Sequence, residues 1–331
     1  MIPSLKNSKH IFLSLFVLVV GACSGRQSVL DPAGRDASTL LTLFLVMLVG
    51  LVVLWIAVNG MMLFFYKLSP RQYDETTARK LIIGGGIVFP TVVVAALLAW
   101  GLSIMPDQRA PGDGLRISVT GEQWWWRVEY WPKGADTPII AANEIRMPVG
   151  ARTTFNLTSA YVIHSFWIPA LGGKMDMFPG RETMISLEPT EAGVFRGQCA
   201  EFCGASHAQM AFEVVTLEPA DFEAWLAQEA LPALSPEGAL AQHGEEVFAA
   251  EGCGACHAVR GTAAVGQVGP DLTHVGSRKS LGAGILEPTI ANIADWIAHT
   301  DDLKPEVEMP AYNEMHENDL VALATYLKGL K

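Results

Sequence analysis

The chain has 331 residues, half of them hydrophobic, with a charged fraction of 17% and a formal net charge of −11. This length allows two or three domains, and so low a charged fraction is unusual for a wholly soluble protein. The acidic balance argues against a nucleic-acid partner, because phosphates would be repelled rather than bound.

The N-terminus has the layout of a secretion signal, with Lys6 and Lys9 ahead of an apolar core at 11–20. The tetrapeptide VGAC that follows, at 20–23, resembles a bacterial lipobox, which implies cleavage before Cys23 and lipidation of its thiol. A plain signal peptide with an incidental cysteine is the alternative. Either interpretation predicts export, so the later domains are expected on the outer side of the membrane.

Two longer stretches without charge follow, one between Asp36 and Lys67 and one between Lys80 and Asp107. Each exceeds the roughly 20 residues that a helix needs to cross a bilayer, and only a helix satisfies its own backbone there. The connecting loop has an excess of Lys and Arg, which marks the cytoplasmic side. We therefore expect a transmembrane hairpin in a bacterial inner membrane, with everything after Asp107 on the periplasmic or outer side.

The region from Leu115 to about Glu218 is predicted to be all-β. Short stretches in it, such as 116–119, 153–157 and 183–187, alternate polar and apolar residues, which is the period of a half-buried strand. Gly and Pro separate these stretches. Several such strands at regular spacing predict a sandwich or barrel.

The segment CAEFCGASHAQM at 199–210, hereafter the cysteine loop, ends this region. A disulfide between Cys199 and Cys203 would suit an exported protein, but it would leave His207 and Met210 unexplained. Zinc has little use for a thioether, whereas thiolate, imidazole and thioether together are a copper set. Because two cysteines can bridge two metals, the motif favours a dinuclear copper centre.

Two coppers need a second imidazole, and His164 in the segment YVIHSFW at 161–167 is the candidate. A lone histidine on a strand is usually an ordinary core or surface residue. The cysteine loop, however, lacks one imidazole, so we expect His164 to supply it.

With these ligands, residues 107–219 resemble the copper-binding domain of cytochrome c oxidase subunit II, and the resemblance extends back over the hairpin to about residue 35. It implies a cupredoxin-type β-barrel that holds a dinuclear copper A centre. The implied ligands are His164, Cys199, the backbone carbonyl of Glu201, Cys203, His207 and Met210. The side chain of Glu201 matches a glutamate that helps to hold a magnesium ion shared with the catalytic subunit.

The segment GEQWWW at 121–126 matches an aromatic segment of the same family. Its first tryptophan, here Trp124, is the residue at which electrons enter the copper domain in that family. The alternative role for Trp124 is that of an apolar anchor at the domain surface.

Many members of this family carry a glutamate near the start of the second membrane helix, where it opens a proton path into the catalytic subunit. Ile83 stands at the corresponding position of this chain. The resemblance therefore does not extend to a proton-uptake role.

Residues 253–257 read CGACH, the C-x-x-C-H signature of c-type haem attachment. Cys253 and Cys256 would bond the haem vinyl groups, and His257 would be an axial iron ligand. A redox dithiol is the alternative. The adjacent histidine, the exported location and the absence of a thioredoxin-like βαβ pattern oppose it.

The second axial ligand is predicted to be Met309, with Met315 as its competitor and with His274 and His299 less favoured. Methionine ligation raises the haem potential, which suits a donor near the oxygen end of a respiratory chain. The leucines at the C-terminus recur at helical spacing and predict a final helix with an apolar stripe; they are Leu320, Leu323, Leu327 and Leu330.

The predicted architecture is a multidomain membrane protein with a two-helix transmembrane hairpin, an all-β cupredoxin-like barrel and an all-α cytochrome c domain. The expected segments are a lipoprotein-type signal peptide at 1–22, an N-terminal segment and hairpin at 23–106, a dinuclear copper domain at 107–219, a linker at 220–242 and a cytochrome c domain at 243–331. Lipid, copper and haem then use all five cysteines.

Taken together, the chain resembles cytochrome c oxidase subunit II with a fused C-terminal cytochrome c domain, the bacterial caa3 type. The resemblance implies that an external donor, such as a soluble or membrane cytochrome c, reduces the haem. Electrons would pass over the copper to the catalytic subunit I of a proton-translocating oxidase, where oxygen becomes water. We expect no catalytic residue in this chain. Expected partners also include other oxidase subunits and, for assembly, a copper chaperone and a thiol reductase.

Alternatives remain. A copper A-containing nitric oxide reductase would use such a chain in the same way. A nitrous-oxide-reductase-like protein carries a propeller domain that is absent here and lacks the hairpin, and a quinol-oxidase subunit lacks the copper ligands. A membrane-tethered copper carrier would need neither a c-type haem nor the Trp124 segment.

Overall fold

The structure is a computed structural model that describes residues 24–69, 73–112 and 114–331. The predicted signal peptide and Cys23 lie outside these described residues. The chain divides into two compact units, one formed by Ser38–Ala110 and one by the segments on either side of it. Each unit is described by itself.

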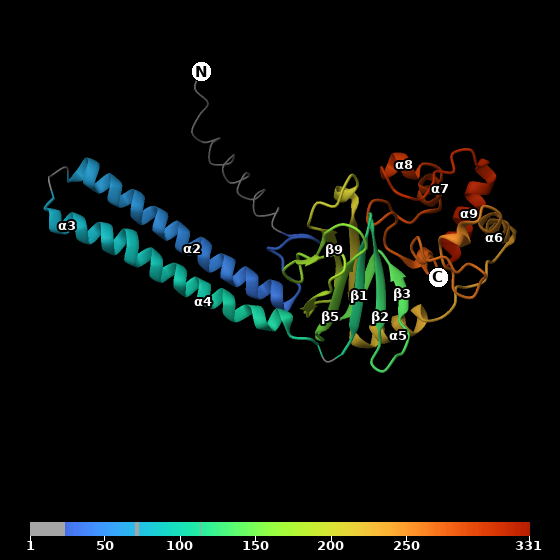
Figure 1. The fold of residues 1–331 in the computed structure, drawn as a ribbon, viewed down its shortest axis with the longest axis horizontal. Coiled ribbons are helices and arrows are strands. Elements are labelled where there is room, and N and C mark those ends of the chain that lie inside the picture. The colour runs from blue at the N-terminus through green and yellow to red at the C-terminus, as the bar shows by residue number, and fades with distance from the viewer. Residues whose placement is uncertain (1–23, 70–72, 113) are drawn as a thin grey trace, which may run out of the picture. The chain divides into compact units, whose positions relative to one another are not determined.

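The smaller unit consists of two long apolar helical segments that run in opposite directions (Figure 1). The first is α2, Arg35–Leu63, with a π-helical end at Phe64–Leu68; the second joins α3, Glu75–Lys80, a π-helical stretch at Leu81–Val88, and α4, Phe89–Arg109. Their mean hydropathies of 2.9 and 2.5, and the exposure of their apolar side chains, fit two membrane spans. The predicted helical hairpin is confirmed in the described residues.

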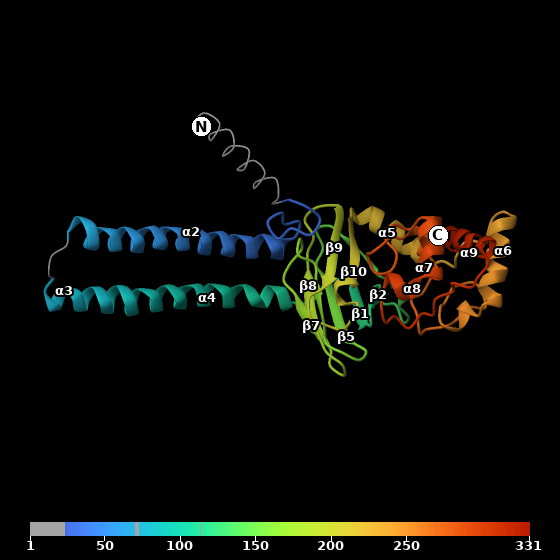
Figure 2. The same ribbon diagram turned by 90° about the horizontal axis from the view of Figure 1, so that it is seen from above.

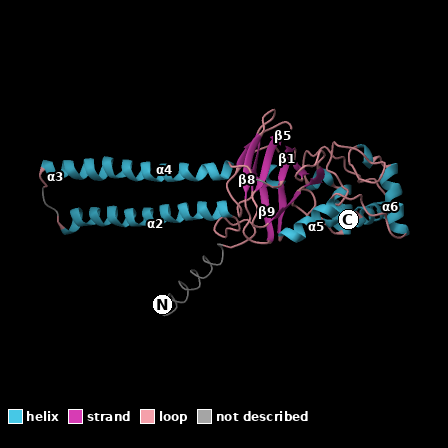
Figure 3. Ribbon diagram, turned by 90° about the horizontal axis from the view of Figure 1, so that it is seen from below, coloured by secondary structure: helices cyan, strands magenta, loops and turns pink. Residues whose placement is uncertain are grey.

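The larger unit begins with two five-stranded sheets whose buried faces share one core (Figure 2). Their strand orders are β3-β2-β1-β5-β8 and β4-β10-β9-β6-β7. The strands are β1 Arg116–Glu122, β2 Trp125–Trp131, β3 Ile139–Ala142, β4 Glu144–Pro148, β5 Thr153–Ser159, β6 His164–Trp167, β7 Met175–Met177, β8 Thr183–Leu187, β9 Gly193–Cys199 and β10 Ala211–Leu217. All strands of the described residues fall within the predicted all-β region (Figure 3).

Aromatic side chains fill the space between the sheets. Strand β2 alternates half-buried and fully buried residues, as a strand with one face on the core should. Its Trp126 meets Phe212 of β10 with ring centroids 5.0 Å apart, and Phe212 stacks on Phe166 of β6 at the same separation. Such ring pairs add to the stabilisation that burial of their area provides. They hold β6 and β10 in fixed positions.

The C-terminal region is helical. Its helices are α5 Pro219–Glu229, α6 Ala239–Ala250, α7 Ile290–Ala298, α8 Thr300–Leu303 and α9 Glu317–Gly329. The apolar stripe predicted for the last helix packs against the core of this region, with Leu320 half-buried and with Leu323, Leu327 and Leu330 buried. The predicted all-α domain is therefore confirmed. Within the span expected to be a linker, α5 is followed by residues 230–238 without a helix or strand.

Helices α6 and α9 cross at Gly244. A Cβ atom added at Gly244 would lie 2.0 Å from the carbonyl oxygen of Ala322 and 2.8 Å from Cβ of Tyr326. Only a glycine permits this approach, so the crossing depends on that residue.

We predict that Gly244→Ala destabilises the helical domain by about 1–3 kcal/mol, because the added methyl group forces the two helices apart. Denaturant unfolding followed by circular dichroism measures this change. Gly329→Ala is the control, since nothing lies within 4 Å of a Cβ atom added there. Equal unfolding midpoints for the two variants would contradict the prediction.

Candidate metal centres

Strand pairing brings two distant segments together at one end of the barrel. Phe166 on β6 is paired with Cys199 at the end of β9, and the Ala200 N–H donates to the carbonyl of Ser165 at 3.0 Å. His164, the first residue of β6, therefore lies beside Cys199 although 35 positions separate them. The next strand, β10, begins directly after the cysteine loop, so both ends of the loop are anchored in one sheet.

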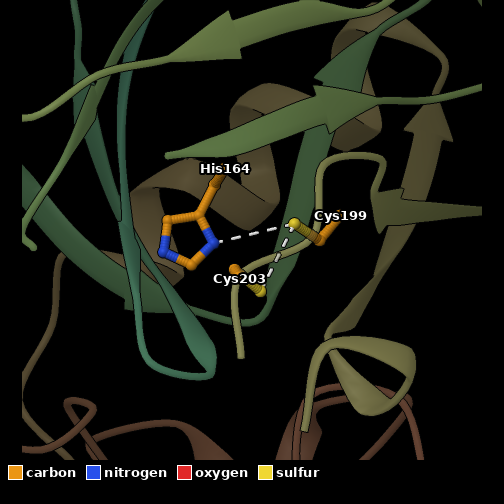
Figure 4. Close-up of side chains that lie close together, drawn as sticks. All are labelled: His164, Cys199 and Cys203. Carbon is orange, nitrogen blue, oxygen red and sulfur yellow. Dashed lines mark hydrogen bonds between the residues drawn. The ribbon is translucent and has the colours of Figure 1, made fainter. Parts of the chain in front are cut away.

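Three predicted ligand groups surround the sulfur of Cys199, and Figure 4 shows two of them, the His164 ring and the sulfur of Cys203. It lies 3.6 Å from His164 Nδ1 and 3.2 Å from the carbonyl oxygen of Glu201. The two cysteine sulfurs are 3.8 Å apart, almost twice the length of a disulfide bond, so both cysteines are free thiols. The disulfide considered as an alternative is therefore absent from the structure.

The remaining predicted ligands surround the sulfur of Cys203. It lies 3.4 Å from His207 Nδ1 and 3.8 Å from the thioether sulfur of Met210. Cys203 and Met210 are buried, and His207 is half-buried. The structure thus brings together all six groups that the sequence nominated as copper ligands.

The surroundings of His164 leave its imidazole available to a metal. Its Nδ1 faces the sulfur of Cys199, whereas its buried Nε2 has no hydrogen-bond partner among the described residues. A Cβ atom added at Gly121 on β1 would lie 2.7 Å from Cδ2 of the ring. The glycine therefore makes room for the imidazole, a role that sequence reasoning did not assign to it.

The two thiols have opposite tendencies to ionise. The hydrogen bond between the two thiols lowers the pKa of Cys199 to about 3, and a contact with His164 acts in the same direction. The same thiol–thiol contact and burial raise the pKa of Cys203. A thiolate is the form of cysteine that binds metal. Two sulfurs, two imidazoles, a thioether and a carbonyl form a soft donor set that fits copper.

Trp124 and Gln123 hold the cysteine loop from the barrel side. The Trp124 indole N–H donates to the carbonyl of Cys203 at 3.0 Å, and the Gln123 side-chain amide donates to the same oxygen at 2.9 Å. Trp124 is only 4% exposed and belongs to the core of the barrel, and its backbone carbonyl accepts a bond from the ammonium of Lys304 at 2.7 Å. The second contact was not foreseen, since a glutamine carries no pattern of its own.

A cavity in the helical domain collects the residues predicted to hold haem. Cys253, His257 and Met309 line it together with Phe248, Leu272, Ile297, Tyr312, Leu323 and Leu327. Met315 packs elsewhere against the same core. Cys256 is exposed, as suits the second attachment point at the rim of such a cavity.

His257 is oriented by its neighbours. Its Nδ1–H donates to the carbonyl of Pro270 at 2.7 Å, and burial lowers the pKa of the imidazole. Burial favours the neutral ring, and the bond to Pro270 keeps the proton on Nδ1, which leaves Nε2 free for iron. A Cβ atom added at Gly269 would lie 2.5 Å from Cε1 of this ring.

The two less favoured histidines lie outside the cavity lining. His274 is buried and its Nε2 donates to the carbonyl of Leu231 at 3.1 Å. His299 pairs with Asp295 at 2.8 Å, and both side chains are about half exposed. Each of these two imidazoles therefore has a protein partner outside the cavity.

Comparison with known proteins gives the same two domains. Residues 132–217 match the family described as cytochrome c oxidase subunit II, periplasmic domain, and residues 241–331 match the cytochrome c family. Cytochrome c oxidase subunit 2 of Alkalihalophilus pseudofirmus is 35% identical over 341 residues, with 98% of this chain and 97% of the relative covered. The chain belongs to the cytochrome c oxidase subunit 2 family.

Cytochrome c oxidase subunit 2 of Bacillus subtilis is 32% identical, with 97% of each chain covered. Among solved structures, the periplasmic domain of subunit II of cytochrome oxidase from Bradyrhizobium japonicum is 31% identical. That match has a TM-score of 0.32 and covers 36% of this chain and 95% of the other. As a subunit 2 with a cytochrome c domain, this chain is part of a haem–copper oxidase, an oxidoreductase complex.

Membership of the cytochrome c oxidase subunit 2 family implies a copper A centre in the first domain and haem c in the second. The soft donor set around Cys199 and Cys203 fits the first group. The apolar cavity lined by Cys253, His257 and Met309 fits the second. The two apolar helices indicate that this subunit is anchored to a membrane.

We predict that Gly121→Ala weakens copper binding roughly tenfold or more, because its methyl group displaces the His164 ring. Titration of the copper-free chain with copper measures the affinity. Gly114→Ala is the matched control, since nothing lies within 4 Å of its added Cβ atom. Equal affinities of the two variants would exclude this role for Gly121.

We predict that Met309→Ala lowers the reduction potential of the haem by on the order of a tenth of a volt or more, because the thioether ligand is lost. Potentiometric titration of the haem absorbance measures the potential. Met315→Ala is the control and should leave the potential unchanged. A drop in Met315→Ala alone would assign the axial ligand to Met315 instead.

Proposed function

We propose that this chain is the subunit through which electrons enter a haem–copper terminal oxidase. Haem c and the copper A centre supply one-electron transfer from an external cytochrome c to subunit I, which reduces oxygen to water. The convergence of two imidazoles, a thioether and a carbonyl on two free thiols carries this proposal. No open position for a substrate is built into this donor set.

The residues proposed to hold copper contribute different types of ligand atom. Copper would be held by the thiolates of Cys199 and Cys203 and by the imidazoles of His164 and His207, and the thioether of Met210 and the carbonyl of Glu201 would complete the set. Strands β6, β9 and β10 hold these groups in one sheet. Because this scaffold is rigid, the ligands would move little when the metal site gains or loses an electron. Little movement favours fast electron transfer.

The residues proposed to hold haem are Cys253, Cys256, His257 and Met309. The cysteines attach it covalently, and the Pro270 carbonyl keeps His257 in the tautomer that an iron ligand needs. We further propose Trp124 as the residue that links this domain electronically to the copper domain. Its hydrogen bond to the carbonyl of Cys203 supports that role.

The side chain of Glu201 is proposed to share a magnesium ion with subunit I. It is about half exposed and lies 3.8 Å from the ammonium of Lys174. An exposed carboxylate next to a metal-binding thiol is suitably placed to face a partner subunit.

Assembly and location complete the proposal. We place the chain in the bacterial inner membrane, with its signal peptide removed at Cys23 and both cofactor domains outside. We propose the same segments as the sequence predicts: a signal peptide at 1–22, the hairpin segment at 23–106, the copper domain at 107–219, a linker at 220–242 and the cytochrome c domain at 243–331. Because Cys199 and Cys203 must stay reduced in an oxidising compartment, a thiol reductase and a copper chaperone are proposed helpers.

The test is gas consumption by the complex that co-purifies with this chain, supplied with a reduced artificial donor. Oxygen and nitric oxide are offered separately, with Cys199→Ala beside the unchanged chain and Gly114→Ala as control. We expect oxygen uptake that Cys199→Ala reduces to background, because a bridging thiolate is lost.

Two results would contradict the oxidase proposal. Nitric oxide consumption without oxygen uptake would keep the same electron path but assign the chain to a nitric oxide reductase. Oxygen uptake that survives Cys199→Ala would remove the copper centre from the path.

A further inference from the structure

A tight turn of the helical domain lies on the barrel next to the cysteine loop. Gly282, Ala283 and Gly284 all have left-handed backbone angles, with φ of 64°, 65° and 88°. An alanine rarely adopts this conformation, so the fold must hold it there. Two of the turn's carbonyls accept bonds from the barrel: that of Ala283 from the Ala211 N–H at 2.9 Å, and that of Gly284 from the Arg196 guanidinium at 3.0 Å.

The third carbonyl of the turn faces a buried lysine. Lys304 is 2% exposed, and its ammonium donates to the carbonyls of Gly282 at 2.8 Å, Trp124 at 2.7 Å and Gln209 at 2.9 Å. An ammonium has three N–H donors, and here each has an acceptor. Lys304 therefore joins three separate segments: the turn, the β1–β2 connection and the cysteine loop.

Residues on both sides of Lys304 also bond to the cysteine loop. The Gln209 side chain donates to the carbonyl of Leu303 at 3.0 Å, and the Ser206 hydroxyl donates to the carbonyl of Pro305 at 2.6 Å. Val307 packs against the core of the barrel. The segment that leads to Met309 is thus seated on the loop that contains the proposed copper ligands.

A buried cation is stable only when every donor is satisfied, and without it one buried and two partly buried carbonyls would lose their partner. The three hydrogen bonds of the Lys304 ammonium therefore depend on one another. One of the three acceptors is the backbone carbonyl of Trp124, whose side chain is buried in the barrel core.

We propose that Lys304 is a positioning residue for electron transfer: it fixes the haem domain on the cysteine loop and on the backbone of Trp124, so that the haem is held at a constant position relative to the proposed copper ligands. The role in electron transfer rests on the proposed function. The contact that Lys304 makes is independent of that function.

The test uses the full chain in its oxidase complex and compares Lys304→Met with Lys328→Met. Lys328 is the matched control, because its ammonium donates to one carbonyl, that of Gly276, inside the helical domain. The first readout is amide hydrogen exchange at Ala211. The N–H of this barrel residue donates to the carbonyl of Ala283 in the helical domain. The second is a kinetic split between reduction of the haem by an external donor and transfer from haem to copper.

We expect Lys304→Met to speed exchange at Ala211 by about tenfold or more and to slow internal transfer severalfold. Reduction of the haem by the donor, and the haem and copper spectra, should stay unchanged, which separates positioning from loss of either site. Unchanged exchange at Ala211, or an equal increase in Lys328→Met, overturns the proposal.

Should Lys304→Met not assemble, Ser206→Ala tests the same contact by removing only the hydroxyl that bonds to Pro305. A smaller increase of exchange at Ala211 supports the proposal, and no increase overturns it. Because exchange requires no turnover, a chain that proves not to serve an oxidase leaves this readout interpretable.

Discussion

The antiparallel pairing of β6 with β9 places His164 beside Cys199, and the geometry of the candidate copper centre follows from it. A ladder of backbone hydrogen bonds fixes both strands, so the imidazole and the first sulfur have little freedom. The chain returns into the same sheet as β10 directly after Met210. The cysteine loop is therefore a short connection held at both ends, which suits a site whose ligands should not move when its charge changes.

The same loop has a second function in the fold. Its inner side presents the two sulfurs, while its outer side is bonded to the helical domain through Lys304 and its neighbours. From the barrel side, Trp124 and Gln123 hold the carbonyl of Cys203. One connection of twelve residues thus contributes both to the donor set and to the contact between two domains.

The two apolar helices serve a different need. Their side chains are exposed throughout the hydrophobic windows, as expected for segments that meet lipid and partner subunits. Hydrophobic burial instead stabilises the barrel, where aromatic rings join the sheets, and the helical domain, where α6 crosses α9. The apolar helices and the candidate cofactor sites therefore occupy separate parts of the chain.

Local chemistry in the sequence was sufficient for the fold class, for the membrane spans and for the nature of both cofactors. Three patterns carried this information: the period of two in the middle region, the long uncharged stretches and the C-x-x-C-H motif. Each of them lies within one continuous segment of the sequence. Contacts between distant residues were decided only by the tertiary structure. His164 could be nominated because the loop lacked an imidazole, but its approach to Cys199 needed the pairing of β6 with β9.

Gly121 and Lys304 had no such signal, since a glycine in a strand and a lysine in a loop are ordinary residues until packing surrounds them. The burial of Trp124 belongs to the same class. The sequence by itself thus determined which chemical groups the chain possesses. The tertiary structure decided which of them meet, because strand register and domain packing depend on the whole chain rather than on any short segment.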